Sequence, residues 1–171
     1  MKLIAFSGLP GTGKTTLAET MGREMGVPVF ALDWLMGVIV PHVEMPSPRV
    51  GAEIGYGLLT TLARRQLMLG QSVILDSVLG LVEGREQWRT LAAEYGAGFY
   101  AIETICSDEG VHRARIEGRR REIPGWYELT WANVEQSRAN FQAWDDARLI
   151  VDAVAPLQAN LERVREFLHE A

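Results

Sequence analysis

An eight-residue segment near the N-terminus, Gly8-Leu9-Pro10-Gly11-Thr12-Gly13-Lys14-Thr15, narrows the choice of folds sharply. It fits the pattern G-x-x-x-x-G-K-[ST] without a mismatch, and it lies between an apolar run at residues 3–6 and a helical pattern at 15–25. Glycines let such a segment turn its backbone N–H groups inward around phosphate oxygens, and the positive end of the following helix adds to the attraction. The segment therefore predicts a phosphate-binding loop between a strand and a helix.

The residue types in this loop suit a nucleotide bound together with Mg²⁺. We expect Lys14 to bridge the outer phosphates and the Thr15 hydroxyl to bind Mg²⁺. The residues expected to contact the nucleotide are those of the loop and the one that follows it: Gly8, Leu9, Pro10, Gly11, Thr12, Gly13, Lys14, Thr15 and Thr16. The chain has no Asn-Lys-x-Asp motif, the motif that reads guanine, and this argues against a GTPase switch.

Short apolar runs alternate with helical patterns along the rest of the chain. The runs predict strands at residues 3–6, 27–32, 72–75, 98–105 and 148–151, and apolar spacing predicts helices at 15–25, 50–69, 83–95, 108–121, 127–144 and from 156 onward. Residues 34–48 contain three prolines and are expected to be mostly irregular. The alternation predicts an α/β fold in three layers, with a mostly parallel sheet covered by helices on both faces.

Length and composition fit one domain over residues 1–171. The chain is 47% apolar and 23% charged, which is enough apolar material for a full core. A net charge of −5 argues against broad electrostatic binding to nucleic acid, although a local basic patch stays compatible with it. The single cysteine, Cys106, fits a reducing compartment. No apolar run approaches the roughly 18 residues needed to span a bilayer, and the N-terminal run is too short for a signal peptide, so we expect a cytoplasmic protein without membrane contact.

Asp76 directly follows the apolar run Val73-Ile74-Leu75, which is the position of a Walker B acid beside a phosphate loop. The carboxyl ends of parallel strands are where such sheets bind ligands. We expect the Asp76 carboxylate to hold Mg²⁺, directly or through water, or to orient the acceptor. The alternative role for this aspartate is to cap a turn.

Asp33 ends the second predicted strand and should open toward the same crevice. A carboxylate there is placed to accept the proton of an attacking hydroxyl while a γ-phosphoryl group is transferred, which makes Asp33 the candidate general base. The alternative is an N-cap for residues 34–40, and the two roles are compatible. Asp76 remains the second candidate for the base.

An arginine-rich helix is predicted over residues 108–121. Arg115 and Arg119 are four residues apart and would share one face, with Gly118 loosening the helix between them. Two guanidiniums on a mobile helix suit closure over the nucleotide, where they would neutralise charge on the transferring phosphoryl group, and they also suit contact with the acceptor. The alternatives are a solvated basic face and, for the run Arg119-Arg120-Arg121, a nucleic-acid contact.

The phosphate loop, Asp33, Asp76 and the spacing Arg115-x-x-x-Arg119 together resemble the small P-loop kinases. These include shikimate, gluconate and adenylylsulfate kinases, chloramphenicol phosphotransferase and the kinase domain of polynucleotide kinase. The resemblance implies a P-loop NTPase fold of about five parallel strands with a helical lid near residues 107–125, and ATP with Mg²⁺ as phosphoryl donor.

The resemblance also assigns roles to single residues. It implies that Asp33 is the general base, that Arg115 and Arg119 are the lid arginines, and that residues 152–155 lie against the adenine. Asp76 is followed by Ser77-Val78-Leu79 instead of the Gly-x-Pro-Arg of adenylate kinases, which disfavours a nucleoside monophosphate as acceptor.

The sequence therefore predicts an ATP- and Mg²⁺-dependent phosphotransferase that phosphorylates a hydroxyl group of a small molecule. Its expected catalytic residues are Asp33, Lys14, Arg115 and Arg119, and its expected metal ligands are Thr15 and Asp76. The alternatives are a polynucleotide 5′-hydroxyl kinase and a non-catalytic ATP-binding module whose lid closes on a partner protein.

Few residues bear on the acceptor. Apolar residues just after Asp33, such as Trp34 and Met36, give a mild preference for an aromatic or lipophilic alcohol. Arg49 and Arg85 are candidates for reading an anionic acceptor, or else surface cations.

Overall fold

The fold is built on one parallel sheet. The computed structural model describes residues 1–145 and 147–169. Its strands are β1 (Lys2–Ser7), β2 (Val29–Ala31), β3 (Val73–Asp76), β4 (Gly98–Ile105) and β5 (Leu149–Asp152). Their order across the sheet is β2-β3-β1-β4-β5, and every pairing is parallel. The α/β fold with a five-stranded sheet predicted from the sequence is confirmed.

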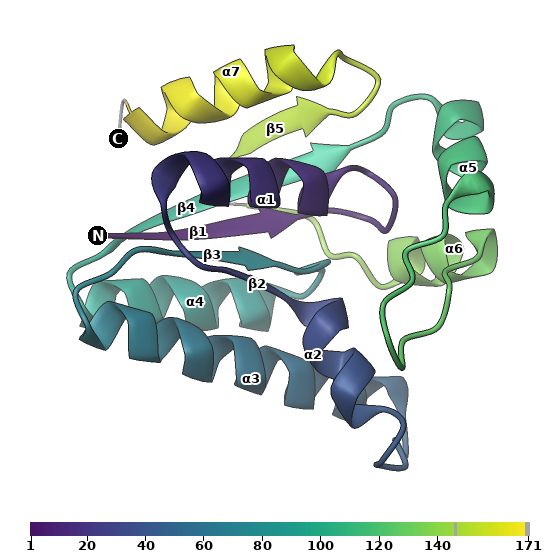
Figure 1. Cartoon of the computed structure of the whole chain (residues 1–171), viewed down its shortest axis with the longest axis horizontal. Coiled ribbons are helices and arrows are strands. Elements are labelled where there is room, and N and C mark those ends of the chain that lie inside the picture. The colour runs from purple at the N-terminus through teal and green to yellow at the C-terminus, as the bar shows by residue number, and fades with distance from the viewer. Residues whose placement is uncertain (146, 170–171) are drawn as a thin grey trace.

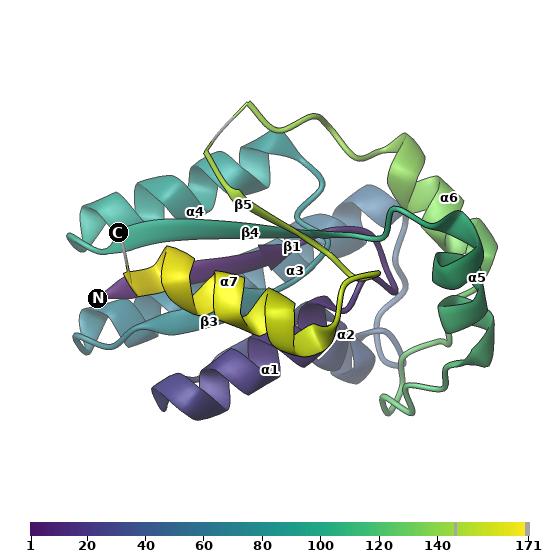
Figure 2. The ribbon, with the colours of Figure 1, turned by 90° about the horizontal axis from the view of Figure 1, so that it is seen from above.

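Helices cover both faces of the sheet (Figure 1). The helices α1 (Lys14–Met25) and α7 (Leu157–His169) lie on one face, and α3 (Pro48–Met68) and α4 (Val82–Glu94) lie on the other. Three shorter helices, α2 (Leu32–Ile39), α5 (Glu109–Gly118) and α6 (Trp131–Ala139), gather toward the edge at which the strands end (Figures 1 and 2). None of the helices described is long and apolar enough to cross a membrane.

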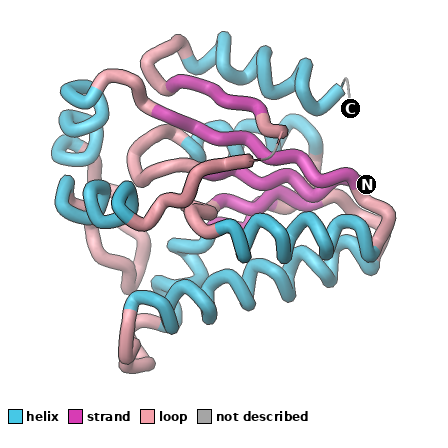
Figure 3. The backbone as a smooth tube through the Cα atoms, turned by 180° about the vertical axis from the view of Figure 1, so that it is seen from behind, coloured by secondary structure: helices cyan, strands magenta, loops and turns pink. Residues whose placement is uncertain are grey.

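The central strand β1 is buried on both faces. Leu3 and Ala5 belong to the core cluster shared with α3 and α4, whereas Ile4 and Phe6 belong to the cluster shared with α1 and α7. The tube in Figure 3 shows the strands lying between the two helical layers. Because both faces are covered, an unbroken apolar run marks such a strand, and this is the signal by which the sequence locates β1.

The register of the strands brings the phosphate loop and two aspartates together. Phe6 of β1 pairs with Asp76 of β3, and Ala31 of β2 pairs with the same Asp76 from the other side. Asp33 lies two residues beyond Ala31, and Gly8 lies two residues beyond Phe6. The loop and both carboxylates therefore meet at the carboxyl edge of three neighbouring strands, where parallel sheets bind ligands.

The prediction that residues 34–48 are mostly irregular is wrong for the first part of that segment. Helix α2 begins at Leu32, so Asp33 lies in the first turn of a helix and does not end a strand. Leu32 and Met36, four residues apart, pack on α3 around Gly55, which gives the short helix an apolar face to bury. The prolines lie beyond it, and Pro48 opens α3 at a position where its missing N–H costs no hydrogen bond.

Helices α5 and α6 are shorter than predicted. Helix α5 ends at Gly118, and Arg119 has an extended backbone with φ −101° and ψ 134°. Arg115 and Arg119 therefore do not share a helix face. Helix α6 covers only the middle of the predicted 127–144, because it begins after Thr130, whose backbone N–H donates to Asn133 Oδ1 at 2.9 Å.

Candidate active site

The phosphate loop is held in shape by contacts with β4. Gly8 has φ +132°, and a Cβ at this position would lie 2.1 Å from the Thr104 carbonyl oxygen, so only glycine fits. The Thr12 hydroxyl lies 2.6 Å from the Thr104 hydroxyl and donates to the Leu9 carbonyl at 2.8 Å. These contacts fix the loop before any ligand arrives.

A buried histidine fastens the same loop to the helices behind it. His112 of α5 is 2% exposed, and its Nε2 lies 2.6 Å from the Pro10 carbonyl oxygen. Its ring meets Trp131 of α6 edge-on at 5.2 Å between centroids. A Cβ on Gly11 would come within 2.6 Å of Ile116, so α5 also packs tightly against the loop itself. His112 is therefore a core residue that supports the loop.

Lys14 is buried at the start of α1. It is 8% exposed, and its Nζ donates to the Leu9 carbonyl oxygen at 2.8 Å. Burial lowers the pKa of Lys14 below its usual value, while the carboxylates of Asp76 and Asp33 act in the opposite direction. The ammonium group thus lies within the field of both predicted acidic residues.

Thr15 and Asp76 are in direct contact. The Thr15 hydroxyl donates to Asp76 Oδ2 at 2.6 Å. Asp76 is 5% exposed, and burial raises the pKa of its carboxyl group, against the opposing effect of Lys14 and the Thr15 hydrogen bond. A hydroxyl and a carboxylate side by side, opening on a cavity, are the hard oxygen donors that Mg²⁺ prefers when phosphates and waters complete its shell.

Asp33 faces the cavity from the first turn of α2 and is paired with an arginine. Its carboxylate accepts from Arg121 Nη1, while Ala31 occupies the N-cap position of α2, so the N-cap role is not the one that Asp33 plays. The Arg121 side chain is 14% exposed, and its Nε and Nη2 are buried without a hydrogen-bond partner among the described residues. Arg121 therefore has two N–H donors left beside the phosphate loop and the acidic pair.

The predicted lid arginines both line a smaller cavity, although they do not share a helix face. Arg115 Nη2 donates to the Ala153 carbonyl oxygen at 2.9 Å, beside a cavity of about 570 Å³ that Thr16, Leu157 and Arg119 also line. Arg119 lines both this smaller cavity and the main one. The predicted contact of residues 152–155 with a nucleotide base has its counterpart in this smaller cavity, because Ala153 and Ala155 form part of its wall.

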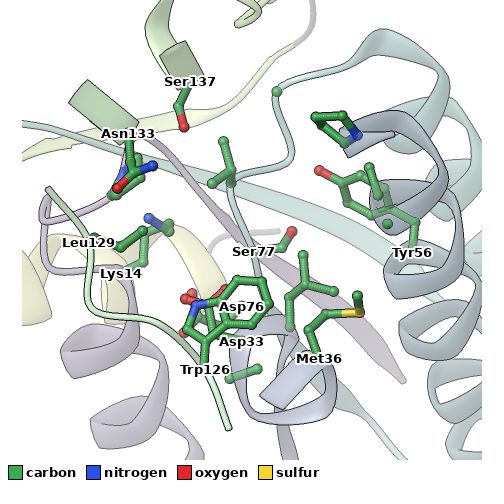
Figure 4. Close-up of a pocket in the computed structure, with 18 of the residues that line it drawn as sticks. Lys14, Asp33, Met36, Tyr56, Asp76, Ser77, Trp126, Leu129, Asn133 and Ser137 are labelled. Atoms are coloured by element: carbon green, nitrogen blue, oxygen red, sulfur yellow. The ribbon is translucent and has the colours of Figure 1, made fainter. Parts of the chain in front are cut away.

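The main cavity has a volume of about 1500 Å³ and extends from the phosphate loop toward α2, α3 and α6. Figure 4 shows Lys14, Asp33 and Asp76 near its middle, with Trp126 drawn in front of the two aspartates in this view. The segment that carries Arg121 and Trp126, residues 119–129, is called the lid loop below. It roofs the cavity on the side of Asp33.

The lid loop is seated on α2 through two glycines. A Cβ on Gly125, which has φ +72°, would lie 2.0 Å from the Gly37 carbonyl oxygen, and a Cβ on Gly37 would lie 2.4 Å from the Pro124 carbonyl oxygen. Such close backbone approach leaves no room for a side chain at either position. The two glycines thus allow the lid loop to pack closely on α2, the helix that carries Asp33.

Several residues of the cavity wall were not among the site residues predicted from the sequence. Arg121 was part of a basic run assigned to a helix or to nucleic acid, and treating Gly118 as a helix stop would have placed it on a loop. Trp126, Tyr56 and Ser77 come from three distant segments, and only the fold brings them together (Figure 4). No local pattern in the sequence marks them as neighbours.

Arg85 is neither a surface cation nor a reader of the acceptor. It is 1% exposed and donates to four carbonyl oxygens, those of Leu79, Gly80, Gln142 and Ala143. Its guanidinium also lies 4.0 Å from the centroid of the Trp144 ring. Arg85 therefore binds the segment after α6 to the loop after β3. Arg49, in contrast, is exposed and paired with Glu53.

Comparisons with known proteins agree with this geometry. A sequence model of the AAA domain family matches residues 3–144. A comparison with curated protein sequences finds no match. Solved structures share the fold over nearly the whole chain, among them a gluconokinase from Sinorhizobium meliloti 1021, with a TM-score of 0.71, 16% identity, and coverage of 98% of this chain and 95% of that one.

Two further solved structures hold nucleotide analogues. Kti12 of Chaetomium thermophilum, in complex with ADP-AlF3, has a TM-score of 0.73 and 21% identity, covering 99% of this chain and 98% of that one. The APS kinase CysC of Mycobacterium tuberculosis, in complex with AMPPNP and APS, has a TM-score of 0.67 and 20% identity, covering 98% and 97%. The resemblance to small P-loop kinases is confirmed at the level of the fold.

Proposed function

The chain belongs to the AAA domain family and has the fold of the P-loop kinases, and from this premise we propose that it transfers the γ-phosphoryl group of ATP to a hydroxyl group of a small molecule, with Mg²⁺ bound. One observation carries the proposal. A single cavity contains the phosphate loop with Lys14 and Thr15, the acid Asp76, and beside Asp76 the second carboxylate Asp33. Nucleotide binding alone has no need of that second carboxylate.

ATP enters with its phosphates in the loop and its base in the smaller cavity. The backbone N–H groups of residues 8–16 and the N-terminus of α1 receive the phosphates, and the Lys14 ammonium turns from the Leu9 carbonyl toward the outer ones. The base lies between residues 153–155 and the face of α5 that carries Arg115. Arg115 thus acts on the nucleoside end of ATP, by holding this wall in place.

The Thr15 hydroxyl and the Asp76 carboxylate suit Mg²⁺ at the phosphates. Among the described residues no group of three or more His, Cys, Asp or Glu side chains is arranged to hold a metal by itself, which fits an ion bound by one or two protein oxygens together with phosphate and water. When bound, Mg²⁺ neutralises charge on the β- and γ-phosphate oxygens. Thr15 and Asp76 fix where that charge lies.

Asp33 acts as the general base. The acceptor hydroxyl gives its proton to the Asp33 carboxylate, its oxygen forms a bond with the γ-phosphorus, and the bond from that phosphorus to the β–γ bridging oxygen breaks to release ADP. Arg121, which is already paired with Asp33, has two N–H donors left for the oxygens of the transferring group. Positioning and charge stabilisation of this kind account for most of the catalysis of phosphoryl transfer.

The lid, near residues 107–125, and the lid loop that continues it shield the transferred group from water. Trp126 lines the cavity together with the two aspartates, and the lid loop rests on α2 at Gly37. Exclusion of water strengthens the electrostatic contacts inside the site and suppresses hydrolysis of ATP.

Transfer of label from γ-labelled ATP tests the function. The protein is incubated with Mg²⁺ and with separate pools of antibiotics, sugars, nucleosides and 5′-hydroxyl oligonucleotides. Label that enters one small-molecule pool, and is lost on removal of Mg²⁺ by EDTA, is the expected result. Label in the oligonucleotides would assign the chain to nucleic-acid end phosphorylation. Label that stays in ATP in every pool, with nucleotide binding intact, would contradict phosphoryl transfer to a hydroxyl.

A further inference from the structure

The acceptor side of the cavity has mostly apolar and aromatic walls. This part, called the acceptor chamber below, is bounded by Met36 of α2, Tyr56 of α3, Ser77 after β3, and Trp126 of the lid loop. Met36 is 3% exposed, and Tyr56 meets Trp88 edge-on at 5.8 Å, so these walls are fixed by the core behind them. A ring-sized apolar body fits between walls of this kind.

Among the described residues, the cations that line the cavity are engaged elsewhere. They are Lys14, Arg49, Arg119 and Arg121. Lys14 and Arg119 belong to the phosphate end, and Arg121 is paired with Asp33 through Nη1, while the proposed function assigns its Nε and Nη2 to the transferring phosphoryl group. The Arg49 side chain is 86% exposed and paired with Glu53. Arg85, the other nearby cation, is occupied by backbone carbonyls.

The acidic residues of the cavity also disfavour an anionic acceptor. Asp33, Glu53 and Glu83 line the cavity, and a carboxylate, sulfate or phosphate on the acceptor would be desolvated near them without a partner. Enzymes that bind anionic substrates commonly use an arginine that grips the anion with two hydrogen bonds. None of the described residues that bound the acceptor chamber is an arginine.

One polar atom in the wall lacks a partner. Trp126 Nε1 is buried and makes no hydrogen bond with the described residues, whereas the Ser77 side chain interacts with the Tyr56 phenol. Burial raises the pKa of this phenol, which therefore stays neutral. An unpaired buried polar group is unfavourable, and a neutral oxygen atom on a ligand, which a small shift of the Trp126 side chain would reach, is the partner it lacks.

Resting on the proposed function, we infer that the phosphate acceptor is an uncharged alcohol with an apolar, ring-sized body and at least one further neutral oxygen. Its hydroxyl lies at Asp33, its ring lies between Met36 and Trp126, and its neutral oxygen accepts a hydrogen bond from Trp126 Nε1. Acidic alcohols, such as sugar acids and phosphorylated sugars, are disfavoured because the cations of the cavity are engaged by the phosphates, Asp33 and Glu53.

The test uses three sets of probes: aryl alcohols, the same alcohols carrying a ring carboxylate, and ring-free polyols. Binding to the full chain with Mg²⁺ and AMPPNP is measured by ligand-observed NMR, which requires no turnover, and transfer of label from γ-labelled ATP is measured in parallel. We expect the uncharged aryl alcohols to bind at least about ten-fold more tightly than either comparison set. Equal or tighter binding of the carboxylates or polyols, or binding of none of the three, would overturn the inference.

A variant that adds a positive charge to the cavity wall sharpens the test. Leu81 lines the cavity and is 38% exposed, so Leu81→Arg adds a cation to the wall without burying it in the core. We expect this variant to bind the carboxylated probes at least about five-fold more tightly than the wild type. Leu69→Arg, at the 62% exposed C-cap of α3, is the matched control and should change nothing. No gain in Leu81→Arg, or an equal gain in both variants, would count against the inference.

Failure of the two proposals can be told apart. Binding of aryl alcohols without any transfer of label would refute the kinase function and leave the ligand class standing. Transfer of label to a carboxylated probe would uphold the kinase function and refute the ligand class.

Discussion

Arg121 and Asp33 form an ion pair that joins the lid loop to the first turn of α2, although 88 residues separate them in the sequence. The pair lies where the phosphate loop and the acceptor chamber meet. It holds the proposed base in place, and it brings a guanidinium to the group that is transferred.

Arg121 and Arg115 should give opposite kinetic signatures when each is replaced by methionine. Arg121→Met removes two donors aimed at charge that develops in the transition state, so kcat should fall by about 10²–10³-fold with KM for ATP changed less than about three-fold. Arg115→Met loosens the wall at Ala153, so KM for ATP should rise by about three- to ten-fold with little loss of kcat. Steady-state kinetics measure both effects. A loss of kcat in Arg115→Met together with a raised KM for ATP in Arg121→Met would assign the catalytic role to Arg115 instead.

The close packing of the lid loop on α2 at Gly37 and Gly125 predicts that a larger side chain at Gly37 weakens acceptor binding but not ATP binding. A Cβ at Gly37 would meet the Pro124 carbonyl oxygen at 2.4 Å, so Gly37→Ala should lift the loop and raise KM for the acceptor by about ten-fold or more. The affinity for ATP should change less than about two-fold, because the phosphate loop is untouched. Gly118→Ala meets nothing within 4 Å and is the matched control. An equal change in KM for the acceptor in both variants would mean that the packing of the lid loop at Gly37 has no role in acceptor binding.

Deprotonation of Lys14 should weaken nucleotide binding at alkaline pH. Burial lowers the pKa of this ammonium below 10.5, so its proton is lost in the folded protein before it would be lost from an ordinary lysine. The charged form binds phosphate, and affinity for ADP should therefore fall as pH rises through the lowered pKa. Calorimetric titrations between about pH 7 and 10 measure the slope. Lys14→Met should bind weakly with no such slope, and a flat wild-type profile would argue against a phosphate contact.

The lowered pKa of Lys14 also affects the pH dependence of the free energy of unfolding. Between the lowered pKa of Lys14 and 10.5 the unfolded chain binds more protons than the folded one, so this group's contribution to the free energy of unfolding rises with pH in that window. Stability and nucleotide affinity should thus move in opposite directions there.

His112 should matter for both stability and binding. His112→Phe keeps the ring against Trp131 but leaves the Pro10 carbonyl oxygen without its partner, at a cost of about 1–3 kcal/mol in the free energy of unfolding. ADP affinity should fall as the loop loosens. Denaturant unfolding and calorimetry check the two effects, with the exposed His42→Phe as control. Unchanged values for His112→Phe would show that the contact does not fasten the loop.

The sequence was most informative where one local pattern carries one function. The phosphate loop is recognisable because its glycines, Lys14 and Thr15 act through nearby backbone geometry, and buried parallel strands such as β1 leave unbroken apolar runs. Asp76 was found for the same reason, since it directly follows a run of this kind.

The rest of the site depends on contacts that no local pattern contains. Arg121 meets Asp33 only because α5 ends at Gly118 and the lid loop folds back onto Gly37. The sequence interpretation extended the helix through Gly118 and so paired Arg119 with Arg115. Trp126 and Ser77 likewise became neighbours through the fold, and their roles could not be predicted from spacing.

Replacement of Asp33 by asparagine tests the central claim most directly. The change keeps the size of the side chain and removes the charge that accepts the proton, so transfer of label from γ-labelled ATP to the acceptor should fall by about 10²–10⁴-fold. ATP affinity, measured on the same preparation, should stay within about three-fold, because Lys14, Thr15 and Asp76 remain in place. Transfer at the wild-type rate in Asp33→Asn would contradict the account and leave Asp76 as the remaining candidate for the base.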